Sequence, residues 1–167
     1  MKRSKKIFVI LLILLGAGLF VAPKKVLAFP SNWRLPLYKS NGFSEGRAVI
    51  SNGPGEGYHT GADAQAVDYF PVGDPWATNH YIRAAHSGTV EYAAEDECAG
   101  NIVGIEQADG KASLYYHLDS IAVSVGQTVS RGQLIGYMGA TGRCANGLHL
   151  HFTARQDVDW NYPLSTG

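Results

Sequence analysis

Basic side chains are scarce in most of this chain. Of its 14 lysine and arginine residues, six lie within residues 1–28, a segment that contains no acidic residue. Residues 29–167 therefore carry eight basic residues against 14 acidic ones, a net charge of −6 that the zero total of the whole chain conceals. An acidic domain of this kind lacks the basic surface that nucleic acids and other anionic polymers bind, so we expect neither as a partner.

Long hydrophobic runs are absent except near the N-terminus, where Ile7–Ala22 is an uncharged apolar run of 16 residues. Basic residues precede this run, and Val26-Leu27-Ala28 offers the small and apolar residues that a signal peptidase reads. The run is shorter than the roughly 20 residues that a membrane-spanning helix needs. We therefore expect residues 1–28 to be a secretory signal peptide. A retained N-terminal anchor is the alternative, because Lys24 and Lys25 after the run are unusual for a cleaved signal.

No cysteine follows the apolar run closely, so a lipoprotein is not expected. With either a signal peptide or an anchor, the rest of the chain would lie outside the cytoplasm, secreted or associated with the cell wall. Cys98 and Cys144 are the only cysteines. In an oxidising compartment, two cysteines in one small domain favour a disulfide over free thiols, so we predict a Cys98–Cys144 bridge. Their spacing does not fit a zinc knuckle.

Residues 29–167 contain no amphipathic helical pattern of ten or more residues, no internal repeat and no low-complexity tract. Residues 29–56 are rich in turn-forming residues, with Arg47–Ile50 as one short strand, and from residue 83 short β-prone segments alternate with Gly and Asp turns. Asp109-Gly110 between two of these segments is a strong hairpin signal. The pattern predicts an all-β fold, a single antiparallel β-sandwich-like domain with long loops. The expected strands are Gly88–Tyr92, Ile102–Glu106, Ser113–His117, Ala122–Val125, Leu134–Met138 and His149–Ala154.

Histidine, in contrast, occurs at informative positions. His149 and His151 lie two residues apart in Gly147-Leu148-His149-Leu150-His151-Phe152. In a β-strand, residues i and i+2 face the same side, so both imidazoles would project from one face. This arrangement suits one metal ligand beside one catalytic group, although this motif alone fits a half-buried strand with two hydrogen-bonded histidines equally well. His59, with a carboxylate close behind it, would complete three ligands of mixed nitrogen and oxygen type, the pattern of catalytic zinc sites.

Five motifs occur together, and they make the interpretation specific. They are His59-x-Gly61, Tyr115-x-His117-Leu118, Val125-Gly126-Gln127-x-Val129-x-x-Gly132-Gln133-x-Ile135-Gly136, Gly139-x-Thr141-Gly142 and Gly147-x-His149-Leu150-His151-Phe152. In this order they resemble the lysostaphin-type (LytM/LasA) zinc metallo-endopeptidases of metallopeptidase family 23, which cut peptidoglycan peptides. The resemblance covers roughly residues 57–154 and implies a zinc endopeptidase domain of the duplicated-hybrid-motif type at residues 57–167, after a loop-rich segment at residues 29–56.

The resemblance also implies a role for each matching histidine. His59 and His151 would bind one Zn²⁺ per chain together with the aspartate of the family motif. His117 and His149 would be catalytic residues that do not bind the metal. One imidazole can take the proton of the attacking water, and the other can donate to the oxyanion or to the leaving amine. Which histidine performs which step stays open. There is no His-Glu-x-x-His helix, and therefore no glutamate base of that type.

Two aspartates are candidates for the remaining ligand. Asp63 follows His59 by four residues, the spacing of many family members. Asp68 matches members with a longer spacer, in which an aromatic residue and a Pro/Gly turn follow the aspartate, as in Asp68-Tyr69-Phe70-Pro71-Val72-Gly73. We predict Asp68, with Asp63 as the alternative. The carboxylate that is not a ligand would face solvent or accept a hydrogen bond from an imidazole N–H.

Other readings are weaker. A non-catalytic relative that binds the cell wall or a partner protein is the alternative function, but such relatives lack one or more of the five site residues, and none is lacking here. Val125–Gly139 also resembles the hairpin of biotinyl and lipoyl domains, yet no lysine follows Lys111, which excludes a covalent carrier. His80 and His86 are expected to be surface or structural residues. We expect a monomer that acts on peptidoglycan peptides and contacts a membrane only if the N-terminal segment is retained; the scissile bond stays open.

Overall fold

The computed structural model describes residues 32–37, 48–57, 59, 63–71, 80–156 and 158–160. The predicted signal peptide at residues 1–28 lies outside these residues. The described part of the chain contains no α-helix, and accordingly no helix in it is long and apolar enough to cross a membrane.

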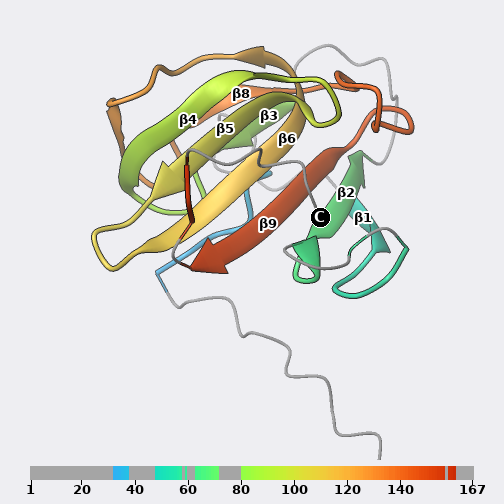
Figure 1. Ribbon diagram of the computed structural model, residues 1–167, viewed down its shortest axis with the longest axis horizontal. Helices are drawn as coiled ribbons and strands as arrows, with labels where there is room; N and C mark the ends of the chain where they lie inside the picture. Colours follow the sequence, from blue (N-terminus) through green and yellow to red (C-terminus); the bar gives the residue numbers. More distant parts are fainter. Residues whose placement is uncertain are drawn as a thin grey trace, which may run out of the picture.

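The described residues form nine strands, and every strand pair among them is antiparallel (Figure 1). The sheet order is β1-β2-β9-β6-β5-β4-β7, and β8 pairs with β6 and with β3. The prediction of an all-β antiparallel fold is therefore confirmed. The strands are β1 (Ala48–Asn52), β2 (Val67–Pro71), β3 (Tyr81–Arg83), β4 (Gly88–Asp96), β5 (Gly100–Glu106), β6 (Lys111–Ile121), β7 (Thr128–Val129), β8 (Leu134–Met138) and β9 (Leu150–Gln156).

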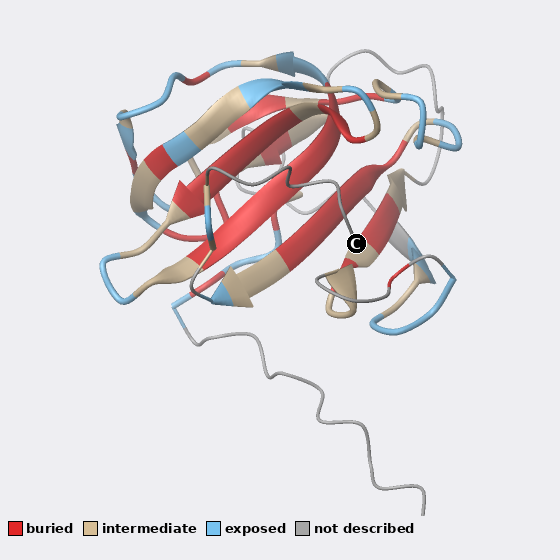
Figure 2. Ribbon diagram, in the orientation of Figure 1, coloured by how far each residue is buried: buried red, intermediate tan, exposed pale blue. Residues whose placement is uncertain are grey.

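The main core lies on one face of the long central strands, where β3 and β8 cover β4, β5 and β6 (Figure 1). Tyr115, Leu150 and Phe152 from β6 and β9 belong to it. The opposite face carries a smaller cluster in which Ile102, Leu114 and Tyr116 are buried. β5 and β6 bury side chains on both faces and form the buried centre of the domain, as the buried colouring along these strands shows (Figure 2).

Three strands, β2, β3 and β7, were not predicted, and one predicted strand is wrong. β3 and β7 have only three and two residues, too few to show an alternating pattern, and β2 overlaps the Asp68–Gly73 segment, which was interpreted through its aspartate and its Pro/Gly turn. Ala122–Val125 is not a strand. β6 continues to Ile121, and the chain then turns, with the Gln127 N–H donating to the Ser124 carbonyl (3.1 Å). Val123 within this turn is buried in the core, so its apolar character serves packing rather than strand pairing.

The predicted hairpin at Asp109-Gly110 is confirmed. Gly110 has a φ of 77°, and its N–H donates to the Gln107 carbonyl at 3.0 Å. The Gln107 N–H in turn donates to the Lys111 carbonyl at 2.8 Å, which closes the turn between β5 and β6. A left-handed conformation of this kind favours glycine, which is why the Asp-Gly pair predicted the turn correctly.

Residues 32–37 pack on the main core rather than lying apart from it. Trp33 is buried, and its indole N–H donates to Gln107 Oε1 at 2.8 Å. His86 is fully buried, with its ring 4.2 Å from that of Trp33, so it is a structural residue and not a surface one. His80 precedes β3, where its carbonyl accepts the Met138 N–H at 2.9 Å.

Candidate metal centre and active site

Strand register places four polar or aromatic side chains in one row across four strands. Asn52 on β1 lies opposite Asp68 on β2, Asp68 lies opposite His151 on β9, and His151 lies opposite Tyr116 on β6. Residues directly opposite each other on antiparallel strands project from the same face. His149 lies two residues before His151, so it is directed to this face as well. The row is the foundation of the site.

A bulge in β6 brings His117 to the same face. Asn101 pairs with Leu118 and Val103 pairs with Tyr115, so that Ile102 stands opposite two residues, Tyr116 and His117. His117 has a φ of 63°, the left-handed conformation that a non-glycine residue seldom adopts. A bulge of this type re-aims side chains and is common near active sites. As a result the imidazole centroid of His117 lies 4.7 Å from that of His149 and 6.1 Å from that of His151.

His59 reaches the site from the loop that follows β1. Its backbone N–H donates to the Glu56 carbonyl at 3.0 Å, and its Nδ1 lies 3.0 Å from the Gly53 carbonyl oxygen. A carbonyl only accepts hydrogen bonds, so Nδ1 carries the proton and Nε2 points elsewhere. That Nε2 lies 3.2 Å from Asp68 Oδ1.

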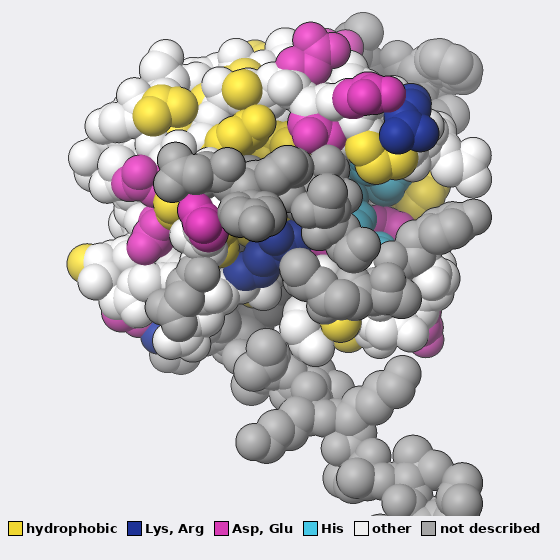
Figure 3. Space-filling model, viewed as in Figure 1, with side chains coloured by type: hydrophobic (Ala, Val, Ile, Leu, Met, Phe, Trp, Pro, Cys, Tyr) yellow, Lys and Arg dark blue, Asp and Glu magenta, His cyan; other side chains and the backbone are white. Residues whose placement is uncertain are grey.

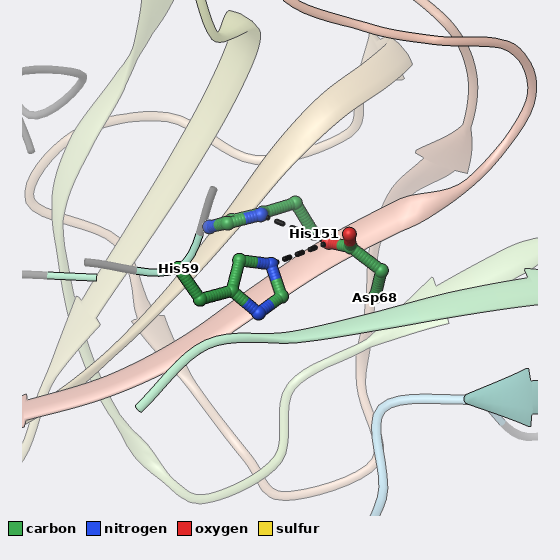
Figure 4. Close-up of side chains that lie close together, drawn as sticks. All are labelled: His59, Asp68 and His151. Atoms are coloured by element: carbon green, nitrogen blue, oxygen red, sulfur yellow. Dashed lines mark hydrogen bonds and ion pairs between the residues drawn. The ribbon is translucent and has the colours of Figure 1, made fainter. Parts of the chain in front are cut away.

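His59, Asp68 and His151 form a cluster that fits a metal ion. One ligand atom from each lies within 4.8 Å of the others, and all three residues are at most 9% exposed. His151 Nδ1 lies 3.0 Å from the same Asp68 Oδ1 that faces His59 (Figure 4). With Nδ1 protonated, a neutral His59 directs a lone pair at a carboxylate oxygen, so a cation or an added proton must stand between them. Two imidazole nitrogens and one carboxylate oxygen are a donor set that zinc accepts.

The charges of these groups agree with a cation at this point. Burial by itself would raise the pKa of Asp68, but hydrogen bonds from His151 and Asn52 and the charges of His151 and His59 hold the pKa well below its ordinary value. Burial would likewise lower the pKa of His151, yet its contacts with Asp63 and Asp68 raise the pKa above its ordinary value. The carboxylates therefore favour a positive charge here. Figure 3 shows histidine side chains recessed on this face beside acidic ones.

Asp63, the alternative ligand, lies on the other side of the His151 ring. Its Oδ2 is 3.7 Å from His151 Nε2, and its Oδ1 accepts from Arg155 Nη2. It is not one of the three residues whose ligand atoms converge. Burial would raise the pKa of Asp63, but His151 and Arg155 together lower it. The convergence of ligand atoms on Asp68 rather than on Asp63 is consistent with Asp68 as the third ligand, and this assignment stays a prediction.

His117 and His149 each have one ring nitrogen fixed by a backbone carbonyl. Nδ1 of His117 donates to the Thr141 carbonyl, and Nδ1 of His149 donates to the Gly147 carbonyl, both at 2.9 Å. The ring of Phe70 also stacks on that of His149, with centroids 5.1 Å apart. Because Nδ1 carries the proton, Nε2 of each ring is free to accept one. Burial and the neighbouring imidazoles lower the pKa of His117 to about 4, so this ring is neutral at neutral pH.

The predicted Cys98–Cys144 disulfide is present, with a Cα–Cα distance of 4.8 Å. It joins the β4–β5 turn to the loop between β8 and β9. The Cys144 N–H also donates to the Cys98 carbonyl at 3.0 Å, and Thr141 Oγ1 accepts the Asn101 N–H at 2.9 Å. These contacts hold the loop whose Thr141 carbonyl orients His117.

Several residues that shape the site were not predicted to do so. Tyr115 and Tyr116 are neighbours on β6 and face opposite sides: Tyr115 belongs to the main core, and Tyr116 stacks on His151, with centroids 5.0 Å apart and ring planes within 4°. Arg155 shares a strand face with His151 through the two-residue alternation of β9, a signal that could have identified it. Asn52 gives no comparable signal, because its Nδ2 reaches Asp68 Oδ2 (3.0 Å) only through the β1–β2 register.

Comparisons with known proteins find similar peptidases among both curated sequences and solved structures. Peptidoglycan DD-endopeptidase ShyC of Vibrio cholerae is 38% identical over 94 residues, which are 56% of this chain and 19% of that protein. The catalytic domain of lysostaphin from Staphylococcus simulans superposes with a TM-score of 0.53 at 28% identity, covering 68% of this chain and 83% of that domain. A zinc-containing peptidase from Vibrio cholerae superposes with a TM-score of 0.51 at 29% identity, covering 74% of this chain and 42% of that one.

The chain thus spans about a fifth of the length of the curated relative. A family model covers a larger share of the chain itself: the model described as Peptidase family M23 matches residues 57–162. This range contains all five residues of the predicted site, and the fold is that of the solved relatives. The chain belongs to peptidase family M23.

Proposed function

We propose that this protein is a zinc-dependent endopeptidase that hydrolyses peptide bonds of peptidoglycan outside the cytoplasm. The observation that carries the proposal is the convergence of His59 Nε2 and His151 Nδ1 on one oxygen of Asp68, with two further imidazoles beside them. The proposal is supported by the activity named for the ShyC relative and by the zinc named for the Vibrio cholerae structure.

His59, Asp68 and His151 would hold the zinc ion in this proposal. Three protein ligands leave an open position, and zinc bound there would lower the pKa of a water and polarise the substrate carbonyl. The protein prepares these ligands before any metal arrives. Hydrogen bonding of His59 Nδ1 to the Gly53 carbonyl selects the tautomer with a free Nε2, and Asn52 occupies Asp68 Oδ2 so that Oδ1 faces the histidines.

His117 and His149 would move protons. Both keep Nδ1 protonated on a backbone carbonyl, so Nε2 of either ring can accept a proton from the attacking water. Once protonated, an imidazole can donate to the oxyanion or to the leaving amine. The neutral form of His117 at neutral pH suits the accepting step. The two rings are close enough, with centroids 4.7 Å apart, to act on the same reacting group.

Two loops would flank the substrate. Residues 53–57 precede His59 and hold it through the Gly53 and Glu56 carbonyls. The β8–β9 loop, residues 139–149, holds His117 through Thr141 and contains His149. A peptide bond that lies between these loops would lie beside both the proposed zinc ligands and the two proton-transfer histidines.

The test combines metal content with hydrolysis. Purified protein is assayed for zinc and is then incubated with peptidoglycan and with a pentaglycine peptide, with and without a chelator. We expect one zinc per chain and chelator-sensitive cleavage. His151→Ala should lose both zinc and activity, whereas His149→Ala should keep zinc and lose activity.

Two results would contradict the proposal. If the wild-type protein binds no zinc, the proposed metal site does not exist and the proposal fails. A protein that binds zinc but cleaves neither peptidoglycan nor the peptide is either a binding module or an enzyme that acts on a different substrate. Loss of zinc from His149→Ala would show that the two histidines of the His-x-His motif have exchanged roles.

A further inference from the structure

Asp63 occupies a position that the proposed ligand set leaves unexplained. Its side chain is only 14% exposed, and its Oδ2 faces Nε2 of His151 at 3.7 Å. Among the described residues, no atom hydrogen-bonds to that buried Nε2. The Asp63 carboxylate is thus the charged group that faces His151 on the side away from Asp68.

Arg155 holds the other oxygen of this carboxylate. Its Nη2 donates to Asp63 Oδ1 and lies 3.3 Å from the hydroxyl of Tyr116. The Tyr116 ring in turn stacks on His151, with ring planes within 4° of parallel. The Asp63 carboxylate therefore faces the edge of the His151 ring, Tyr116 packs across its face, and Arg155 contacts both of these groups.

The two ring nitrogens of His151 then have different roles. Nδ1 points at Asp68 Oδ1 and would supply the lone pair to a bound zinc ion, in which case a neutral imidazole carries its proton on Nε2. A carboxylate beside that proton favours this tautomer, fixes the plane of the ring and makes Nδ1 a stronger donor. Arg155 engages Oδ1 of Asp63, which keeps Oδ2 directed at His151.

We propose that Asp63, held in place by Arg155, is a positioning residue that orients His151 for zinc binding and is not itself a ligand. This inference rests on the proposed function, because it assumes that the site binds zinc. It gives the second aspartate of the segment a defined role, separate from that of Asp68.

The experiment measures zinc affinity by competition with a chelator, together with zinc stoichiometry, for the full chain and its variants. Loss of such a partner typically weakens metal binding by about 10–100-fold. We expect Asp63→Asn to bind one zinc with an affinity lowered by about that factor. Asp109→Asn is the matched control, because Asp109 also pairs with a basic residue, Lys111, but on the surface away from the site. Its zinc affinity should equal that of the wild type.

A second variant separates positioning from stability. Asp63→Asn leaves Arg155 without its carboxylate, which could unfold the protein. Asp63→Asn combined with Arg155→Met removes both charges of this ion pair. This double variant should also bind zinc about 10–100-fold more weakly than the wild type. In zinc-loaded, ¹⁵N-histidine-labelled protein, the Nε2–H proton of His151 should lie upfield and exchange faster in both Asp63 variants than in the wild type.

The possible results are distinct. A wild-type chain without zinc overturns the proposed function and this inference with it. If the wild type binds zinc but both Asp63 variants bind it within twofold of the wild type, with an unchanged Nε2–H resonance, only the inference fails. If Asp63→Asn binds no zinc while Asp68→Asn still binds one, Asp63 is the ligand, and the positioning role is overturned.

Discussion

Replacing Cys98 and Cys144 together with serine should destabilise the protein by an amount that follows from chain length. The bridge closes a loop with a sequence separation of 46 residues, which contains β5, β6, β7 and β8. In the chain-entropy treatment, removing a crosslink across such a loop lowers the free energy of unfolding by about 4 kcal/mol at 25 °C. For a domain of this size we expect the melting temperature to fall by about 10 °C, at roughly 2–4 °C per kcal/mol.

The assay is urea and thermal unfolding of the native protein and the double-serine variant, followed by circular dichroism. Wild-type protein unfolded in the presence of a reductant provides a matched control that changes no residue, and it should coincide with the variant. A loss of less than about 1 kcal/mol in both samples would refute the reasoning. It would mean either that the bridge does not form or that the unfolded chain already holds the two cysteines together.

The same variant should separate metal binding from catalysis. His59 after β1, Asp68 on β2 and His151 on β9 all lie outside the bridged loop. The disulfide instead supports the Thr141 carbonyl that orients His117. We therefore expect the double-serine variant to keep its zinc content and to lose hydrolytic activity. Loss of zinc in parallel with activity would contradict this division.

Two further predictions concern residues away from the metal ligands. Gly142→Ala should lower the free energy of unfolding, measured in urea, by about 2 kcal/mol or more. Gly142 has a φ of +80°, and a Cβ there would lie 2.2 Å from the backbone nitrogen of Gly100. Gly132→Ala is the matched control, because Gly132 has a φ of +85° but nothing within 4 Å of its Cβ position, so this variant should lose only about 1 kcal/mol. Equal losses of unfolding free energy in the two variants would show that the close approach of residue 142 to Gly100 does not add to the destabilisation. His86→Phe should make stability less dependent on pH between about 7.5 and 5, because burial lowers the pKa of His86 in the folded protein below its ordinary value of 6.5. The unfolded wild type then binds more protons, so its stability falls as the pH drops below 6.5, whereas phenylalanine keeps the contact with Trp33 without this loss. If the slope of unfolding free energy against pH is the same in His86→Phe and in the wild type, this prediction for His86 is wrong.

The strand pattern of the domain was largely predictable, because period-two alternation and turn residues are local signals. The predicted segments at β4, β5, β6, β8 and β9 all contain strand, and Asp109-Gly110 forms the expected turn. Local signals failed where a segment was too short to alternate, as in β3, and where apolar residues pack into the core from a turn, as Val123 does. Tertiary packing decides such segments rather than propensity.

In the candidate site, too, some features follow from the sequence alone and others only from the tertiary structure. The sequence by itself determined which side chains are available: two histidines that share one face because a strand alternates every two residues, a third histidine after a glycine-rich loop, and two cysteines able to form a bridge. Only the tertiary structure decided that Asp68 and not Asp63 stands opposite His151, since the register of β2 against β9 sets that pairing and a slip of one residue would reverse the faces. It also decided that His117 turns toward His149, because a bulge against β5 changes the direction of its side chain. Register and bulges depend on contacts between residues far apart in the chain, so no local pattern specifies them.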